Sequence, residues 1–248
     1  MGDPVIHFEV IGTDGPTLGK FYGELFGWHI QSMPEMNYEI VDTHAGSGIN
    51  GGVGGGDPSD PATFTTVYVE VADPQASLDK AVSLGATVAM PVMAIPGAVT
   101  LAQFFDPQGC RIGLVKSEPD QGAMGVSAGD NPAVGWFEIL GSDALALHTF
   151  YSALFGWKFP QVHAEFGNYG EVDTDSAGRG IPGGVGTSQG EPTVTVYAAV
   201  DDLAKYLERA TSLGGEAVLQ PMPVGEGTTI AAFRDPQGNL FGLMNSTS

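Results

Sequence analysis

The chain has 248 residues, 42% of them hydrophobic and 15% charged, which suits one or two globular domains and excludes a disordered chain. Nine lysine and arginine residues against 29 aspartate and glutamate residues give a net charge of −20. This charge repels phosphate backbones and anionic lipid, so we expect no nucleic acid and no membrane as partners. A small-molecule ligand that is neutral, cationic or singly charged is expected instead.

The predicted elements begin directly at the amino terminus. Residues 5–10 read as a strand with no basic region or apolar signal core before them, which predicts a cytoplasmic protein. A helix is predicted to start near Asp14, because apolar residues then recur at helical spacing, and to stop at Gly27. The apolar residues on that face are Leu18, Phe21, Tyr22, Leu25 and Phe26.

A second unit of the same kind follows in the chain. It opens with a strand at residues 65–71, and a helix is predicted over residues 74–84. The sequence Asp-Pro-Gln-Gly at residues 106–109 is typical of a hairpin turn between two further strands. The single cysteine, Cys110, follows this turn and excludes an internal disulfide framework.

The second half of the chain repeats the first. The segment Phe-Tyr-x-x-Leu-Phe-Gly-Trp occurs at residues 21–28 and again at residues 150–157, an offset of 129. The turn at residues 106–109 returns at residues 235–238 with the same offset of 129. The two halves are therefore predicted to be structural duplicates.

Residues 117–132 separate the copies, and they are rich in glycine, proline, aspartate and serine without hydrophobic periodicity. We therefore predict one domain at residues 1–117, a linker at residues 118–131 and a second domain at residues 132–248.

These two motifs, each repeated at matching spacing, resemble the vicinal oxygen chelate superfamily. The superfamily includes glyoxalase I, bleomycin-resistance proteins, fosfomycin-modifying enzymes and extradiol dioxygenases. The resemblance covers nearly the whole chain. It implies an α+β fold with two tandem glyoxalase-like domains, each built of paired βαβββ modules that curl into a cup-shaped mixed sheet around a ligand.

Enzymes of this superfamily hold a divalent metal on side chains from the first and last strands of the modules. The matched positions in this chain are His7, Trp136, Thr66, Thr195, Gly113 and Gly242. A three-ligand site needs histidine or carboxylate at each corner, and among the six only His7 qualifies. We therefore predict no cofactor and a lost metal site; a divalent metal, with His7 as a ligand, is the disfavoured alternative.

Acid–base chemistry is the first function predicted for the cups. Strand alternation puts His7 and Glu9 on one face, and Trp136 and Glu138 on the matching face of the copy. A carboxylate inside an apolar cup has its pKa raised by desolvation, which suits a general acid or base. Glu9, Glu138 and His7 are the catalytic candidates. The alternative is that each glutamate accepts hydrogen bonds and fixes the shape of the cup.

Aromatic residues with polar handles are candidates for the ligand pocket, with core packing as the alternative for each. The candidates are Trp136, Tyr38, Tyr169, Asn37, Asn168, Thr66, Tyr68, Thr195 and Tyr197. The glycine-rich run at residues 51–54, echoed at residues 183–186, lacks the Lys-Ser/Thr and the helix of a phosphate loop. We predict a flexible or tightly turning segment at the cup mouth that can act as a lid.

Several functions stay open at this point. The first is a metal-independent enzyme of small-molecule metabolism, with lyase-, hydroxylase- or cyclase-like chemistry at Glu9 or Glu138. The alternative is a bleomycin-resistance-like protein that sequesters an antibiotic or metabolite without catalysis, with the acidic charge favouring a cationic drug. A metal-dependent glyoxalase or dioxygenase fits the fold but conflicts with the missing ligands. The duplication can replace a dimer, so a monomer or a homodimer is expected.

Overall fold

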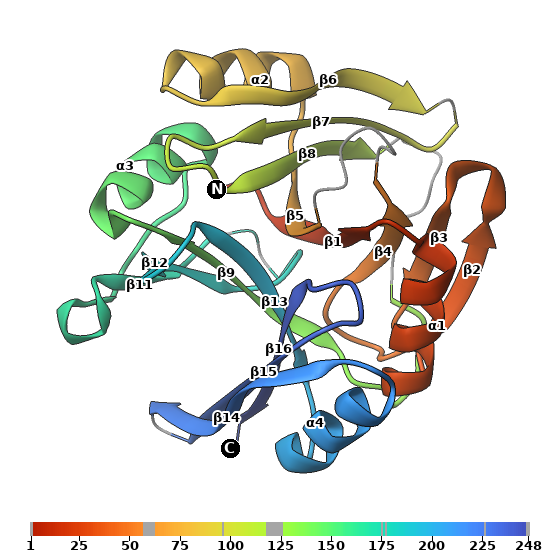
Figure 1. Cartoon of the computed structure of the whole chain (residues 1–248). Coiled ribbons are helices and arrows are strands. Elements are labelled where there is room, and N and C mark those ends of the chain that lie inside the picture. The colour runs from red at the N-terminus through yellow and green to blue at the C-terminus, as the bar shows by residue number, and fades with distance from the viewer. Residues whose placement is uncertain are drawn as a thin grey trace. The chain divides into compact units, whose positions relative to one another are not determined.

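The computed structural model of the chain describes residues 2–56, 63–95, 97–117, 126–174, 176, 178–225 and 227–246 (Figure 1). Its elements form four βαβββ modules in chain order. The first module consists of β1 (Val5–Gly12), α1 (Gly15–Phe26), β2 (His29–Met33), the short 3-10 helix η1 (Pro34–Met36), β3 (Tyr38–Asp42) and β4 (Asn50–Gly55). The second consists of β5 (Phe64–Glu70), α2 (Pro74–Ser83), β6 (Thr87–Ile95), β7 (Val99–Phe105) and β8 (Arg111–Ser117).

The second half repeats this order. The third module consists of β9 (Val134–Gly141), α3 (Ala144–Phe155), β10 (Val162–His163), η2 (Ala164–Phe166), β11 (Tyr169–Val172) and β12 (Gly183–Thr187). The fourth consists of β13 (Thr193–Ala199), α4 (Leu203–Ser212), β14 (Glu216–Gly225), β15 (Thr228–Arg234) and β16 (Leu240–Ser246). No helix among these described residues is both long and apolar enough to cross a membrane.

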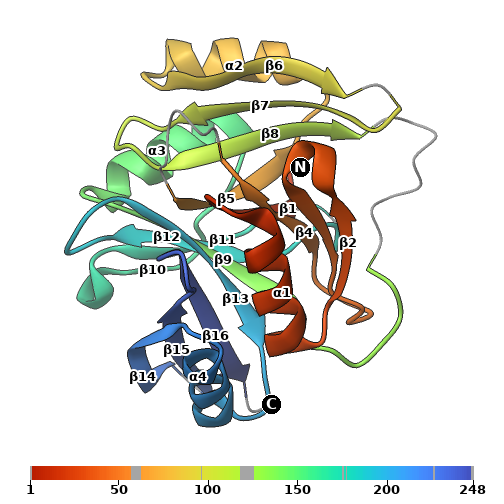
Figure 2. The same ribbon diagram turned by 45° about the vertical axis from the view of Figure 1, so that its right-hand side comes forward.

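Local sequence signals explain where the helices begin and end. An aspartate stands before each of the four helices as its N-cap, and the Asp14 side chain accepts a hydrogen bond from the Thr17 N–H at 3.1 Å. Gly27 ends α1 with φ 77°, a left-handed conformation that favours glycine. Helix α1 packs on β2, β3 and β4 (Figure 2).

Each half forms one eight-stranded sheet. The strand orders are β2-β3-β4-β1-β5-β8-β7-β6 and β10-β11-β12-β9-β13-β16-β15-β14. Parallel pairs such as β5 with β8 and β9 with β12 lie beside antiparallel hairpins, so both sheets are mixed. The predicted α+β class and the paired βαβββ modules of a tandem glyoxalase-like fold are confirmed.

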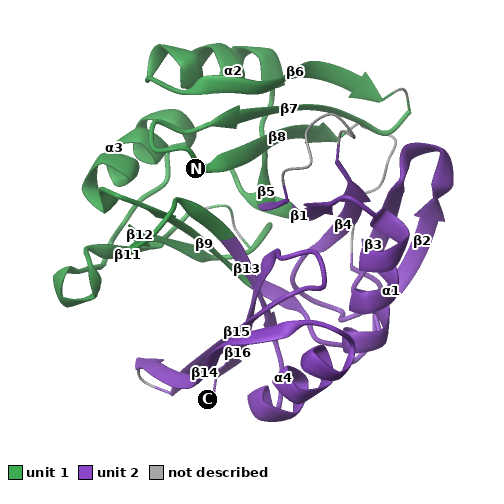
Figure 3. Ribbon diagram, in the orientation of Figure 1, with its two compact units in different colours: residues 1–7, 66–125, 136–194 green, residues 8–65, 126–135, 195–248 purple. Residues whose placement is uncertain are grey.

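The compact units of the molecule do not follow the halves of the sequence. Unit 1 contains residues 1–7, 66–125 and 136–194, and unit 2 contains residues 8–65, 126–135 and 195–248 (Figure 3). Each unit thus joins one module of the first half to one module of the second. The boundary predicted at residues 118–131 stays a prediction, because residues 118–125 lie outside the described part of the chain.

In unit 1, the two repeated motifs bind each other. The Tyr151 hydroxyl of α3 donates to the Asp106 carboxylate at 2.7 Å, and the Asp143 N–H donates to Gln108 Oε1 at 2.8 Å. Burial raises the pKa of Asp106 from its usual value, and burial beside Asp106 raises the pKa of Tyr151. The Asp-Pro-Gln-Gly turn of the first half therefore anchors the helix of the second.

Unit 2 carries the same connection with the halves exchanged. The Tyr22 hydroxyl donates to Asp235 at 3.1 Å, and the Asp14 N–H donates to Gln237 Oε1 at 3.0 Å. Tyr22 is fully buried, and burial with the nearby Asp235 charge raises its pKa. The hairpin turn predicted at both sites is confirmed, and the turn also caps the helix of the opposite half.

Candidate functional site

The glycine-rich runs are strands, and the prediction of a turning or lid-like segment is wrong. Residues 51–54 lie inside β4, and residues 183–186 lie inside β12. A Cβ atom at Gly52 would lie 1.8 Å from the hydroxyl oxygen of Tyr38, and one at Gly184 would lie 2.0 Å from that of Tyr169. The glycines are required because a tyrosine ring lies flat across each strand.

In unit 2, that tyrosine reaches a candidate glutamate. The Tyr38 hydroxyl donates to Glu9 Oε1 at 2.9 Å, and the Glu9 side chain is half-buried. The neighbouring Glu39 is buried on the other side, where a Cβ atom at Gly19 of α1 would touch it. Tyr38 and Glu9 therefore lie on the face turned away from the helix, which we call the open face of a module.

Unit 1 holds the matching arrangement with an added indole. The Tyr169 hydroxyl donates to Glu138 Oε1 at 3.0 Å and accepts a hydrogen bond from Trp136 Nε1 at 3.1 Å. Burial, together with the Glu138 charge, raises the pKa of Tyr169 far above its usual value. The phenol therefore stays protonated and continues to donate to Glu138. Three of the predicted site residues are thus in direct contact.

His7 lies in unit 1 beside Tyr68, with the two ring centroids 5.7 Å apart in an edge-to-face arrangement. Burial lowers the pKa of His7 to about 4, so the imidazole is neutral near pH 7. A neutral imidazole can take up or pass on a proton, and the catalytic role of His7 stays a prediction.

Two functional candidates on the same face were missed in the sequence. Gln103 Nε2 donates to the Tyr68 hydroxyl at 2.5 Å, and Arg111 Nε donates to Gln103 Oε1 at 2.7 Å. The Arg111 guanidinium carbon lies 5.6 Å from the centroid of the Phe105 ring. Gln103 and Tyr68 each pair in register with Gly113, and Arg111 lies two residues before Gly113 on the same strand. Strand alternation around Gly113 could therefore have indicated both Gln103 and Arg111.

The threonine candidates are buried. The Thr66 hydroxyl donates to the backbone carbonyl oxygen of Arg111 at 2.7 Å, which ties β5 to β8. Thr195 is its buried counterpart on β13, beside the buried Tyr197. For Thr66 this contact is structural, whereas a ligand contact stays a prediction for all three.

The asparagine candidates occupy tight turns. Asn37 and Asn168 have φ values of 48° and 56°, the left-handed region that asparagine tolerates better than most residues. Asn37 Oδ1 accepts a hydrogen bond from the Gly15 N–H at 3.1 Å. Asn37 directly precedes Tyr38, and Asn168 directly precedes Tyr169, the tyrosines that reach the glutamates. The two asparagine turns therefore fix where β3 and β11 begin.

The residues present do not fit the divalent metal that the family resemblance implies. A Cβ atom at Gly113 would lie 2.3 Å from a Tyr68 ring carbon, and one at Gly242 would lie 2.2 Å from a Tyr197 ring carbon. A carboxylate at either position would displace the ring. Within the described ranges, no group of three or more histidine, cysteine, aspartate or glutamate side chains is placed to hold a metal ion.

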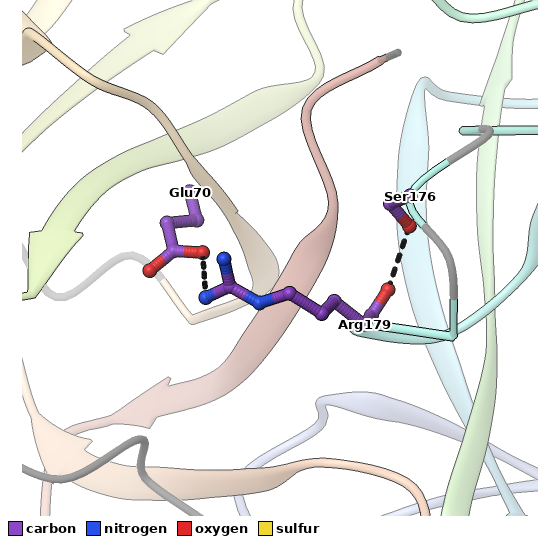
Figure 4. Close-up of polar contacts among 3 residues, drawn as sticks. All are labelled: Glu70, Ser176 and Arg179. Carbon is purple, nitrogen blue, oxygen red and sulfur yellow. Dashed lines mark hydrogen bonds and ion pairs between the residues drawn. The ribbon is translucent and has the colours of Figure 1, made fainter.

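Unit 1 also holds an ion pair beside a cavity. Arg179 forms an ion pair with Glu70 of β5, and Ser176 Oγ donates to the backbone oxygen of Arg179 at 2.8 Å (Figure 4). A cavity of about 350 Å³ lies beside them, lined by residues 172–174, 176 and 178–182. None of the predicted site residues lines this cavity.

Comparison with known sequences supports the family resemblance. Residues 133–243 match the family model for the Glyoxalase/Bleomycin resistance protein/Dioxygenase superfamily. The chain is 28% identical over 247 residues to CFP32 of Mycobacterium bovis, and the match covers 94% of this chain and 90% of that one. CFP32 is provisionally named a glyoxylase. It is 32% identical over 126 residues to the anthracycline biosynthesis protein DnrV of Streptomyces peucetius, covering 45% and 46% of the two chains.

Solved structures share the fold at low sequence identity. The Mn(II)-bound glyoxalase from Novosphingobium aromaticivorans is 16% identical with a TM-score of 0.72, covering 98% of this chain and 82% of that one. The 2,3-dioxygenase LapB from Pseudomonas sp. KL28 is 10% identical with a TM-score of 0.67, covering 100% and 94% of the two chains.

Proposed function

We propose that this chain, whose second half matches the glyoxalase/bleomycin resistance protein/dioxygenase superfamily model and whose halves share the fold of solved glyoxalase and dioxygenase structures, acts on a small molecule by metal-independent acid–base chemistry. The observation that carries the proposal is the pairing of a tyrosine with a glutamate on the open face of each half, Tyr38 with Glu9 and Tyr169 with Glu138. Each glutamate is the proton acceptor, and each tyrosine holds its carboxylate in place.

The chemistry follows from the properties of the two groups. A carboxylate within reach of an acidic C–H or O–H bond of a substrate takes the proton, and the protonated carboxyl group can return it at another atom of the same molecule. The tyrosine hydrogen bond fixes the carboxylate orientation before the substrate arrives, which lowers the cost of reaching a reactive geometry. Such proton transfers are the common step of lyase- and cyclase-like reactions, whereas a hydroxylase-like reaction also needs molecular oxygen as the oxidant.

The aromatic surroundings favour a planar aromatic substrate. Trp136 and Tyr169 are hydrogen-bonded to each other next to Glu138, and aromatic walls with few polar groups are typical of ligand sites. The similarity to DnrV, which is named for anthracycline biosynthesis, supports a polycyclic aromatic ligand of that kind. The net charge of −20 additionally favours a cationic ligand, and thereby supports the alternative of sequestration without turnover.

Binding can be followed through one of the three tryptophans. Trp28 and Trp157 are buried at 4% and 1% exposure, whereas Trp136 is half-buried next to Glu138. Titration of the purified protein with an anthracycline should quench this tryptophan fluorescence, and Trp136→Phe should remove most of the quenching. Absence of any quenching or thermal stabilisation would count against the proposed ligand class.

Turnover then separates catalysis from sequestration. Mass spectrometry of the ligand after incubation should show a product with the wild-type chain and about 100-fold less with the Glu9→Gln/Glu138→Gln double variant, with binding retained; either single variant keeps the carboxylate of the other half. A tightly bound ligand recovered unchanged from the wild type would establish sequestration instead. Full turnover by the double variant would refute the role of the carboxylates.

A further inference from the structure

In unit 1, three side chains form one hydrogen-bonded chain. Trp136 Nε1 donates to the Tyr169 hydroxyl at 3.1 Å, and that hydroxyl donates to Glu138 Oε1 at 3.0 Å. Trp136 and Glu138 lie two residues apart on β9, so strand alternation puts both on the open face. The phenol reaches them from β11 because its ring crosses β12 over Gly184, which pairs in register with Glu138.

The direction of each hydrogen bond follows from the chemistry of the three groups. An indole N–H only donates, an ionised carboxylate only accepts, and a phenol has one proton to donate and lone pairs that accept. Burial, together with the Glu138 charge, raises the pKa of Tyr169, so the phenol keeps its proton. The charge of Glu171, which pairs in register with Gly184, acts in the same direction. Because Trp136 can only donate to the phenol oxygen, the Tyr169 proton lies on the side of Glu138.

We propose that Trp136 is a positioning residue, which directs the Tyr169 proton onto Glu138 and so holds this carboxylate ionised before a substrate arrives. The proposal rests on the proposed function, in which Glu138 is a proton acceptor, because a carboxyl group can take up a proton only in its ionised form. It names the residue that keeps the acceptor of the second half in that form.

Trp136 acts through the phenol in two ways. A hydrogen bond that the phenol oxygen accepts polarises the O–H bond, which makes the phenol a stronger donor to Glu138. A stronger hydrogen bond to the charged form of a carboxyl group favours that form. In addition, a phenol proton turned toward Trp136 would set two donors against each other, so the hydroxyl keeps its direction when a ligand enters.

The first half has a different residue type at the matching position. His7 corresponds to Trp136 at the offset of 129. A neutral imidazole donates from one ring nitrogen and accepts at the other, so a histidine does not impose a single direction on a hydroxyl group. The proposal therefore concerns Glu138 of the second half.

The test follows the titration of the Glu138 carboxyl group by NMR, in the full-length chain isotopically labelled at its glutamate carboxyl carbons, and it needs no substrate. The Glu138 signal is the one that disappears in Glu138→Gln. Trp136→Phe keeps an aromatic ring without the N–H and should raise the pKa of Glu138 by roughly 0.5. Trp28→Phe is the control, because its indole N–H donates to the backbone oxygen of Pro132 in unit 2, and it should leave that pKa unchanged.

A double-mutant cycle shows whether Trp136 acts through Tyr169. Tyr169→Phe alone should raise the pKa of Glu138 by roughly 1, because it removes the hydrogen bond to the carboxylate itself. Trp136→Phe added to Tyr169→Phe should raise it no further. If Trp136→Phe is poorly folded, the benzothiophene analogue of tryptophan at position 136 keeps the shape of the ring and lacks only the N–H.

Two results would overturn the proposal: an unchanged pKa of Glu138 without the indole N–H, or an equal rise with and without the Tyr169 hydroxyl. Either would mean that the indole only packs beside Glu138. The proposed function would still stand, because it depends on turnover and on its loss in the Glu9→Gln/Glu138→Gln double variant. The expected pKa changes in a chain without any turnover would refute the proposed function while supporting the positioning by Trp136.

Discussion

Replacement of Gly113 by alanine tests whether the tyrosine ring fills the place of a metal ligand. The new Cβ atom would lie 2.3, 2.4 and 2.5 Å from three carbon atoms of the Tyr68 ring. Carbon atoms pack at about 3.5–4.0 Å, so the ring must shift by roughly 1 Å. Gln103 holds the hydroxyl end of that ring, which limits the movement. We expect Gly113→Ala to lower the free energy of unfolding by about 1–3 kcal/mol.

The assay is urea unfolding followed by circular dichroism, with Gly135→Ala as the matched control. Among the residues that the structure describes, no atom outside its two chain neighbours lies within 4 Å of a Cβ atom at Gly135, a glycine of strand β9, so its replacement should be neutral or stabilise by about 0.4–1 kcal/mol. The Gly113→Ala loss should shrink when Tyr68 is also replaced by alanine, which gives a favourable coupling energy in a double-mutant cycle. Equal stability of the two single glycine variants would refute the reasoning, because it would mean that Gly113 has room for a side chain.

Three other outcomes follow from the geometry. The folded-state pKa of His7 is about 4, below its unfolded value, so the unfolded chain takes up the proton first as the pH falls. The free energy of unfolding should therefore fall by about 2 kcal/mol from pH 7 to pH 5. His7→Gln should make the free energy of unfolding, measured with urea, depend less on pH over this range. Tyr151→Phe removes the buried donor to Asp106 and should cost about 1–3 kcal/mol in unfolding free energy at pH 7. The loss should become smaller as the pH falls and Asp106, whose pKa is raised by burial, takes up a proton; a loss that does not change with pH would contradict the charge argument. Tyr169→Phe, made in a Glu9→Gln background so that turnover reports on Glu138, should reduce turnover about 10-fold while ligand binding stays within a factor of a few, since the phenol orients Glu138. Unchanged turnover in that background would show that this hydrogen bond has no catalytic role.

Much of the fold could be predicted because its signals are local and occur twice. The apolar spacing and the Gly27 stop of α1, the aspartate before each helix and the Asp-Pro-Gln-Gly turns all act within a few residues. The compact units could not be predicted in this way. Contacts such as Tyr22 with Asp235 join residues 213 positions apart, and nothing in the local pattern indicates which half each motif will bind.

The candidate site was predicted in part for a similar reason. Strand alternation places Glu9 and Glu138 on open faces, and the tyrosine partners were among the ligand candidates. The glycine runs were misinterpreted because glycine usually indicates a turn, whereas here it makes room for a ring that only the folded sheet brings close. Arg111 was missed because its contact with Gln103 joins two neighbouring strands, and such a contact is not visible in the local sequence pattern.

The central claim, acid–base chemistry without a divalent metal, is tested most directly by metal binding. Purified protein is titrated with Mn(II), Ni(II), Zn(II) and Fe(II) at neutral pH, and the metal that remains after desalting is measured by elemental analysis. The account predicts no stoichiometric retention of any of the four, because the Tyr68 and Tyr197 rings cover Gly113 and Gly242. One tightly held metal per chain, lost in the His7→Gln variant, would contradict it and indicate a metalloenzyme centred on His7.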